Sequence, residues 1–139
     1  MSLNVIRAQI YESVSRDASA PSYASLKPIC KMPLCTLKTN LVASVIPKDF
    51  HLKLVKYIAS LLKKDIEKIT LVVEPGVEIS RAGTMDPNCY LSIHSINVFN
   101  AEKNKEYGPS LRSFIAENLP LQPNRIVITL LDLKATDLV

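Results

Sequence analysis

The nitrogen of one proline offers the most distinctive chemistry in this sequence. Met32 and Pro33 stand at the head of an alternating segment, Lys31 to Asn40, which reads KMPLCTLKTN. Such a pair is typical of a translation start that has further chain placed ahead of it. If Pro33 is a terminus, its nitrogen is a secondary amine that can act as a base. If Pro33 follows Met32 in a peptide bond, its nitrogen is an amide whose lone pair is held by resonance.

The other reactive side chains favour structural interpretations when each is taken alone. The three cysteines, Cys30, Cys35 and Cys89, are odd in number and lack a repeating spacing, which argues against a disulfide framework and a zinc site. We expect reduced thiols, with Cys35 and Cys89 as small core residues. His94 lies in an alternating segment, where a histidine is more often packed than catalytic. Lys64 follows a predicted helix, where a lysine commonly complements the helix dipole.

Composition indicates a globular protein with one main domain. The chain has 139 residues, of which 47% are apolar and 22% charged, and this length suits a single domain with a sizeable core. Its 17 basic and 13 acidic side chains give a net charge of +4. These charges are interspersed, so we expect a mixed solvated surface and no nucleic-acid partner. No apolar stretch is long enough to cross a bilayer, so we expect no membrane insertion.

The first 32 residues differ in character from the rest. They are rich in serine and alanine, and charged residues such as Arg7 and Glu12 interrupt any apolar run that a secretory signal would need. We therefore expect residues 1–32 to be an N-terminal extension that is disordered or is not part of the mature chain. The folded domain is expected to cover residues 33–139.

The first half of this domain has the pattern of a strand, a helix and a strand. Residues 33–41 alternate and predict a strand, and residues 66–73 form a second, β-branched strand. Between them, Asp49 can cap a helix whose apolar face is formed by Phe50, Leu54, Val55, Ile58, Leu61 and Leu62. A strand-helix-strand unit of this kind predicts two parallel strands.

The second half repeats the same plan. Residues 89–99 and 125–131 predict strands, and residues 101–119 predict a helix with Leu111, Phe114, Ile115 and Leu119 on one face. Gly108 and Pro109 fall within this helix. Because an interior proline costs a helix about 3 kcal/mol, we expect either a kink there or a helix that begins near Pro109.

The predicted fold class is α/β, or α+β by some schemes. Its two βαβ repeats form a four-stranded mixed sheet with two helices on one face. The other face needs a cover, because residues assigned to it, such as Leu91, Ile93, Val127 and Leu131, are too apolar for water. We therefore expect a homo-oligomer with sites at subunit junctions.

The segment from Pro33 to Val139 resembles the macrophage migration inhibitory factor and D-dopachrome tautomerase family. The matching features, in order and with matching spacing, are Met32-Pro33, Thr39-Asn40, Pro47 with Phe50, Lys64, Pro75, Gly83, Asp86-Pro87, the run SIHSI at residues 92–96, and Asp132-Leu133. The resemblance implies a tautomerase-like fold and a homotrimer whose three sheets surround a central channel.

The resemblance also implies a chemistry. Pro33, as a free terminal amine, would be the catalytic base of an isomerase that moves a proton between carbon and oxygen. Lys64 would hold the substrate carboxylate, and the backbone N–H of Ile96 would be a second donor. The implied substrates are phenylpyruvate-type aromatic keto acids and dopachrome, and no metal or organic cofactor is needed. The alternative is a cytokine-like protein that binds a cell-surface receptor, or a pseudoenzyme that lacks tautomerase activity. With either function, we expect the protein in the cytoplasm, or secreted without a signal peptide, or both.

The sequence departs from the family pattern at several positions. A tyrosine and an asparagine that the family's pocket draws from a neighbouring subunit are replaced by Val127 and Thr129, and a glycine is replaced by Asn97. Of the family's two-cysteine motif only Cys89 is present, with Ser92 in the other place, so we expect no thiol-redox activity. The family continues beyond the position of Val139 into a tail that supports the trimer, and we expect weaker trimer contacts without it.

Overall fold

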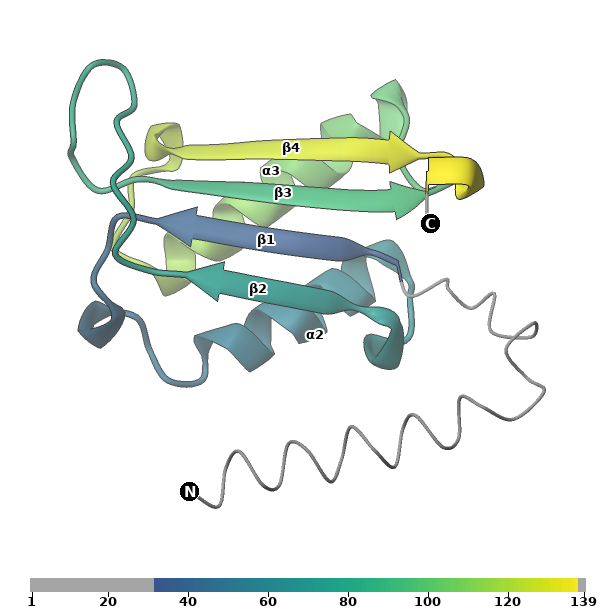
Figure 1. The fold of residues 1–139 in the computed structure, drawn as a ribbon, viewed down its shortest axis with the longest axis horizontal. Helices are drawn as coiled ribbons and strands as arrows, with labels where there is room; N and C mark the ends of the chain where they lie inside the picture. Colours follow the sequence, from purple (N-terminus) through teal and green to yellow (C-terminus); the bar gives the residue numbers. More distant parts are fainter. Residues whose placement is uncertain (1–31, 138–139) are drawn as a thin grey trace. The chain divides into compact units, whose positions relative to one another are not determined.

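Two strand-helix-strand units share one sheet (Figure 1). The computed structural model describes residues 32–137, so the expected extension lies outside the described residues apart from Met32. The helices and strands are β1 (Leu34–Thr39), α2 (Phe50–Leu62), β2 (Thr70–Glu74), β3 (Cys89–Ile96), α3 (Ala101–Asn118) and β4 (Ile126–Leu133).

The sheet is mixed and has the strand order β2-β1-β3-β4. Strand β1 runs parallel to β2 and antiparallel to β3, and β3 runs parallel to β4. Both helices lie behind the sheet in the view of Figure 1, so they cover the same face. The predicted fold class, a four-stranded mixed sheet with two helices on one face, is confirmed.

The core lies between the helices and every second residue of the strands. On β1, Cys35 and Leu37 are fully buried, while Leu34, Thr36 and Lys38 point to the other face. This alternation is the two-residue repeat of a strand with one covered face. The strand residues meet a helical layer that buries Phe50, Leu54, Ile58 and Leu62 from α2 and Leu111 and Ile115 from α3.

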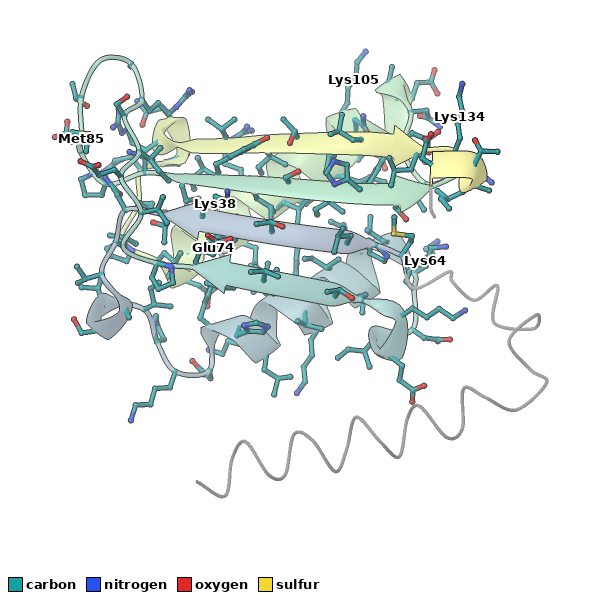
Figure 2. The ribbon with its side chains drawn as sticks, in the orientation of Figure 1. Lys38, Lys64, Glu74, Met85, Lys105 and Lys134 are labelled. Carbon is teal, nitrogen blue, oxygen red and sulfur yellow. The ribbon has the colours of Figure 1, made fainter. Side chains whose placement is uncertain are left out.

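The expectation that Leu91 and Ile93 lie on the uncovered face is wrong. Both side chains have no exposed surface and belong to the core. The register explains why: Leu91 stands opposite Leu37 and Ile93 opposite Cys35, which are themselves core residues. Val127 and Leu131 do belong to the uncovered face, because they pair with Tyr90 and His94. That face, shown toward the viewer in Figure 2, is called the open face below.

Aromatic side chains hold the two helices together. The rings of Tyr57 and Phe114 stack with centroids 4.3 Å apart and an interplanar angle of 17°. The Tyr57 hydroxyl donates a hydrogen bond of 3.2 Å to the carbonyl oxygen of Ser110. Such contacts fix the lateral position of α2 against α3.

No helix within residues 32–137 is both long and apolar enough to span a membrane.

Two expectations about the helix starts need correction. Asp49 does occupy the N-cap position of α2, but its side chain makes no capping hydrogen bond; its Oδ2 lies 3.1 Å from Nζ of Lys53, one turn into the helix. Of the two alternatives for Pro109, a helix that begins near this residue is wrong, because α3 starts at Ala101, as its pattern predicts, and includes that proline. Its start is fixed instead by Asn100, whose Oδ1 accepts from the Lys103 N–H at 2.8 Å.

The strand ends differ from the predicted ones for local reasons. A 3₁₀ turn at Ile66–Lys68 precedes β2, so this strand starts at Thr70 rather than at residue 66. Strand β3 ends at Ile96 because Asn97 adopts a left-handed backbone conformation with φ of 55°. Side-chain alternation predicts that a strand is present, but it does not reveal short turns of this kind at the strand's ends.

We predict that Leu91→Ala lowers the free energy of unfolding by about 2–5 kcal/mol, because it leaves a cavity in a closed core. Urea unfolding followed by circular dichroism measures this cost. Leu52→Ala is the matched control, because Leu52 lies on α2 with 54% of its surface exposed and alanine is a good helix former. Similar costs for the two variants would contradict the assignment of Leu91 to the core.

Candidate functional site

Pro33 lies at the entry to the central strand. It immediately precedes β1 and is fully buried. Its carbonyl oxygen accepts a 3.1 Å hydrogen bond from the N–H of Thr70, the first residue of β2. Met32, to which Pro33 is joined by a peptide bond, is also buried, with 6% of its surface exposed. With this peptide bond in place, the nitrogen of Pro33 is an amide inside a packed environment.

The end of β3 lies beside this entry. Leu34 pairs with His94 across the antiparallel ladder, so two further steps along β3 place Ile96 beside Met32. The carbonyl of Pro33 points to β2, and backbone groups alternate in direction along a strand. By this alternation the N–H of Ile96 is directed toward the β1 side of β3. A molecule in the place of Met32 would therefore meet a backbone donor.

Lys64 reaches the same end of the sheet from helix α2. The helix stops at Lys63, which has a left-handed backbone with φ of 55°, and the N–H of Lys64 donates to the Ala59 carbonyl at 3.0 Å. Figure 2 shows Lys64 at the end of the sheet where β1 begins and β3 ends. Lys64 and Asn97, the residue that follows Ile96, line one cleft of about 490 Å³ between α2 and α3.

The structure thus brings the three predicted site residues to one end of the sheet. It does not place all three in one pocket, because the cleft that Lys64 lines does not include Pro33 or Ile96. The buried state of Pro33 and Met32 accounts for this difference. Within residues 32–137, no three His, Cys, Asp or Glu side chains are grouped so that they could hold a metal ion.

The guanidinium of Arg125, a residue that the sequence did not single out, holds the loop between β2 and β3. Its N–H groups donate to four carbonyl oxygens of that loop, those of Arg81 (2.9 Å), Asp86 (2.9 Å), Pro87 (3.3 Å) and Thr84 (3.5 Å). The only signal in the sequence is an arginine between a Pro-Asn turn and a β-branched strand. Its partners lie about 40 residues earlier in the chain, so no local pattern identifies them.

Asn40 and Asn88 complete the support of this loop. Asn40 donates from Nδ2 to the Met85 carbonyl at 2.9 Å and accepts the N–H of Asn88 at 2.9 Å. The hydroxyl of Thr39 donates to the Asn88 carbonyl at 2.8 Å. The Thr39-Asn40 pair, in which Thr39 ends β1 and Asn40 follows it, is therefore a structural element at the opposite end of the sheet from Pro33.

The two described cysteines face the core, and their thiols are unreactive near neutral pH. Burial raises the pKa of the Cys35 and Cys89 thiols to about 12. Because the thiolate is the reactive form, neither sulfur is suited to redox or nucleophilic chemistry near neutral pH. His94 is half-buried on the open face, between Leu34 of β1 and Leu131 of β4.

Comparison with known proteins places the chain in a family. Residues 32–139 match the family model described as macrophage migration inhibitory factor. The chain belongs to the macrophage migration inhibitory factor family. It is 34% identical over 104 residues to D-dopachrome decarboxylase of Xenopus tropicalis, covering 74% of this chain and 88% of that protein. It is 27% identical over 106 residues to macrophage migration inhibitory factor of Rattus norvegicus, covering 76% and 92%.

Solved structures share the fold. The macrophage migration inhibitory factor of Trichinella spiralis superposes with a TM-score of 0.71 at 22% identity, covering 73% of this chain and 90% of that one. The corresponding protein of Oncomelania hupensis gives a TM-score of 0.70 at 24% identity, with 73% and 74% covered. These likenesses support the tautomerase-like fold independently of the sequence pattern.

Val127 and Thr129, which the family resemblance places in a pocket shared between subunits, lie on β4 far from Pro33 of the same chain. Val127 pairs with Tyr90, which pairs with Lys38, and Lys38 is five residues along β1 from Pro33. At about 3.3 Å per residue along the strand and about 4.8 Å between neighbouring strands, this places Val127 roughly 19 Å from Pro33 within one chain. One copy of this family member therefore cannot bring Val127 to Pro33, so any contact between them needs a second copy.

We predict that Cys35 and Cys89 resist thiol reagents in the folded protein. With a pKa of about 12, a thiol at pH 8 is thiolate in only about one molecule in 10⁴. The Cys30→Ser variant isolates these two residues, and 5,5′-dithiobis(2-nitrobenzoic acid) should release no thiolate signal in buffer. The same sample in guanidinium chloride is the control and should react at both sites. Rapid reaction in buffer would refute the burial of these thiols.

Proposed function

We propose that the processed protein is a keto–enol tautomerase of the phenylpyruvate and dopachrome type. The observation that carries the proposal is the position of Pro33, buried at the end of the sheet where β3 also ends and Lys64 follows α2. The names of its D-dopachrome decarboxylase and macrophage migration inhibitory factor relatives support the same class of protein.

The proposed chemistry follows from the properties of a buried secondary amine. Burial disfavours the charged ammonium form, which lowers the amine's pKa toward neutrality, and a base of that strength suits proton transfer at neutral pH. The neutral nitrogen of Pro33 takes a proton from the carbon next to a keto group, leaving an enolate. The resulting ammonium then donates a proton to the enolate oxygen, which yields the enol and regenerates the amine.

Lys64 and Ile96 have binding roles in this scheme. The Lys64 ammonium would hold the carboxylate of an aromatic keto acid by a charge-assisted hydrogen bond, and the Ile96 N–H would add a neutral donor. Both groups lie at the end of the sheet where Pro33 stands. Val127 and Thr129 replace larger polar residues of the family, so this pocket would select substrates more by apolar contact than by hydrogen bonds.

The scheme requires the peptide bond before Pro33 to be absent. An amide nitrogen is not basic, and Met32 fills the space beside it. Initiation at Met32 followed by removal of that methionine, or cleavage before Pro33, would create the amine and empty the space in one step.

The burial of Met32 beside Pro33 favours a second function for the uncleaved chain: a cytokine-like protein that binds a cell-surface receptor and lacks tautomerase activity. Either form would act in the cytoplasm or after secretion without a signal peptide.

The open face supports a homotrimer. Its exposed apolar residues include Leu34 (42% exposed), Val72 (42%), Tyr90 (39%) and Leu131 (46%). Apolar side chains gathered on one uncovered sheet face are typical of an interface between subunits. A second copy would also supply Val127 and Thr129 to a neighbouring Pro33, which a single chain cannot do.

We predict that a chain beginning at Pro33 tautomerises phenylpyruvate, while the chain beginning at Met1 does not. The expected difference in kcat/KM is about 10²- to 10⁴-fold, the usual contribution of a general base. The rate is measured by absorbance of the enol–borate complex, and intact mass verifies each terminus. Pro33→Gly in the short form keeps an amine but removes the ring, and it should lose most of the activity. Equal activity in both chains would refute Pro33 as the base.

We predict that Leu131→Arg dissociates the proposed trimer, because it buries a charge on the open face. Analytical ultracentrifugation measures the mass of each form. Leu52→Arg is the matched control, since Leu52 is exposed on the helical side, and it should leave the mass unchanged. A trimer that survives Leu131→Arg, or a wild-type monomer at micromolar concentration, would argue against assembly through this face.

A further inference from the structure

The cleft between α2 and α3 is lined by more basic than acidic side chains. It has a volume of about 490 Å³ and is lined by Lys63, Lys64 and Lys103, with Glu106 as its one acidic lining residue. Three cations against one anion leave the cleft net positive. Lys63 and Lys103 are exposed and Lys64 is half-buried, so their ammonium groups can turn toward a bound molecule.

These three lysines lack ion-pair partners among the described residues. The salt bridges within residues 32–137 join Lys53 to Asp49 and Lys68 to Asp65, and neither involves a cleft lysine. Like charges that share a cleft repel each other, and a partner of opposite charge would relieve that repulsion. The cleft is therefore electrostatically complementary to an anion.

Local helix electrostatics account for only part of this arrangement. Lys63 and Lys64 follow the C-terminus of α2, where the helix dipole favours cations. Lys103 lies in the first turn of α3, where its N–H is held by the cap residue Asn100 and where the dipole disfavours a cation. The stability of α3 therefore gives no reason for a lysine at this place, and Lys103 lines the cleft.

The remaining lining residues indicate what the uncharged part of a ligand would contact. Leu61, Leu62 and Val98 are apolar, and the ring of Tyr107 packs edge-on against Phe99 with centroids 6.0 Å apart. Left-handed residues at Lys63 and Asn97 fix the two turns that border the cleft. We propose that this cleft binds a small organic phosphate, in which a dianionic group meets the three lysines and an aromatic or aliphatic body lies against the apolar wall and Tyr107.

The cleft shares Lys64 with the proposed tautomerase pocket, but its test does not depend on tautomerase activity, because binding is measured directly. Phenyl phosphate is the probe, and its dissociation constant is obtained by isothermal titration calorimetry on the full chain. Inorganic phosphate and phenol are separate arms that test the two halves of the ligand. We expect phenyl phosphate to bind at least fivefold more tightly than either arm and to weaken as the salt concentration rises.

The decisive comparison uses two lysines of the same helix. Lys103→Gln should weaken phenyl phosphate binding about fivefold, a modest loss because the side chain is exposed. Lys105→Gln makes the same charge change in the same helix, but Lys105 does not line the cleft, so this variant should change affinity less than twofold. Lys63→Asn, which keeps a residue tolerant of the left-handed backbone, should match Lys103→Gln.

Several results would overturn the proposal. Equal losses for Lys103→Gln and Lys105→Gln would mean that phosphate responds only to the overall charge of the protein. Binding of inorganic phosphate as tight as that of phenyl phosphate would remove the role of the apolar wall. Undetectable binding of phenyl phosphate at millimolar concentration to a folded chain, verified by circular dichroism, would leave the cleft without this ligand.

Discussion

The architecture depends on the pairing of Leu34 with two partners at once. On one side Leu34 pairs in parallel with Thr70 of β2, and on the other it pairs antiparallel with His94 of β3. This double register brings the start of β1, the start of β2 and the end of β3 to one end of the sheet. The α2–β2 connection, which carries Lys64, must then return to that same end. For this reason a proline, a backbone donor and a lysine from distant parts of the sequence lie at the same end of the sheet.

The pattern of residues is sufficient to predict the fold, but it does not decide which face of the sheet each strand residue occupies. The helical spacing of Phe50, Leu54 and Ile58 and the repeated strand-helix-strand plan gave the two units and their covered face. Strand β3 is apolar at Leu91 and Ile93, and an apolar residue by itself does not say which face it occupies. That choice comes from the register against Leu37 and Cys35, which only the paired strand determines. A one-residue slip would exchange the two faces.

The sequence marks candidate residues where their chemistry is local and not where a role depends on long-range contacts. Pro33 is recognisable from its methionine and from the strand it begins. Arg125 has no such marker, because its four acceptors are carbonyl oxygens of a loop far back in the chain. Backbone acceptors carry no side-chain identity, so no residue type reveals them. The support of that loop therefore becomes visible only once the fold has brought the two segments together.

The burial of Met32 links the fold to the state of the proposed site. An internal Met32–Pro33 unit contributes apolar surface to the packing at the start of β1, and it has no N–H to satisfy at Pro33. A terminal Pro33 loses that packing and gains a nitrogen that must be neutral or hydrogen-bonded in its buried place. The space that the proposed catalysis would need is thus the space that Met32 fills in the longer chain. If the proposed mechanism holds, removal of Met32 would give up packing at the start of β1 in return for a basic nitrogen, so stability and activity would oppose each other at this one peptide bond.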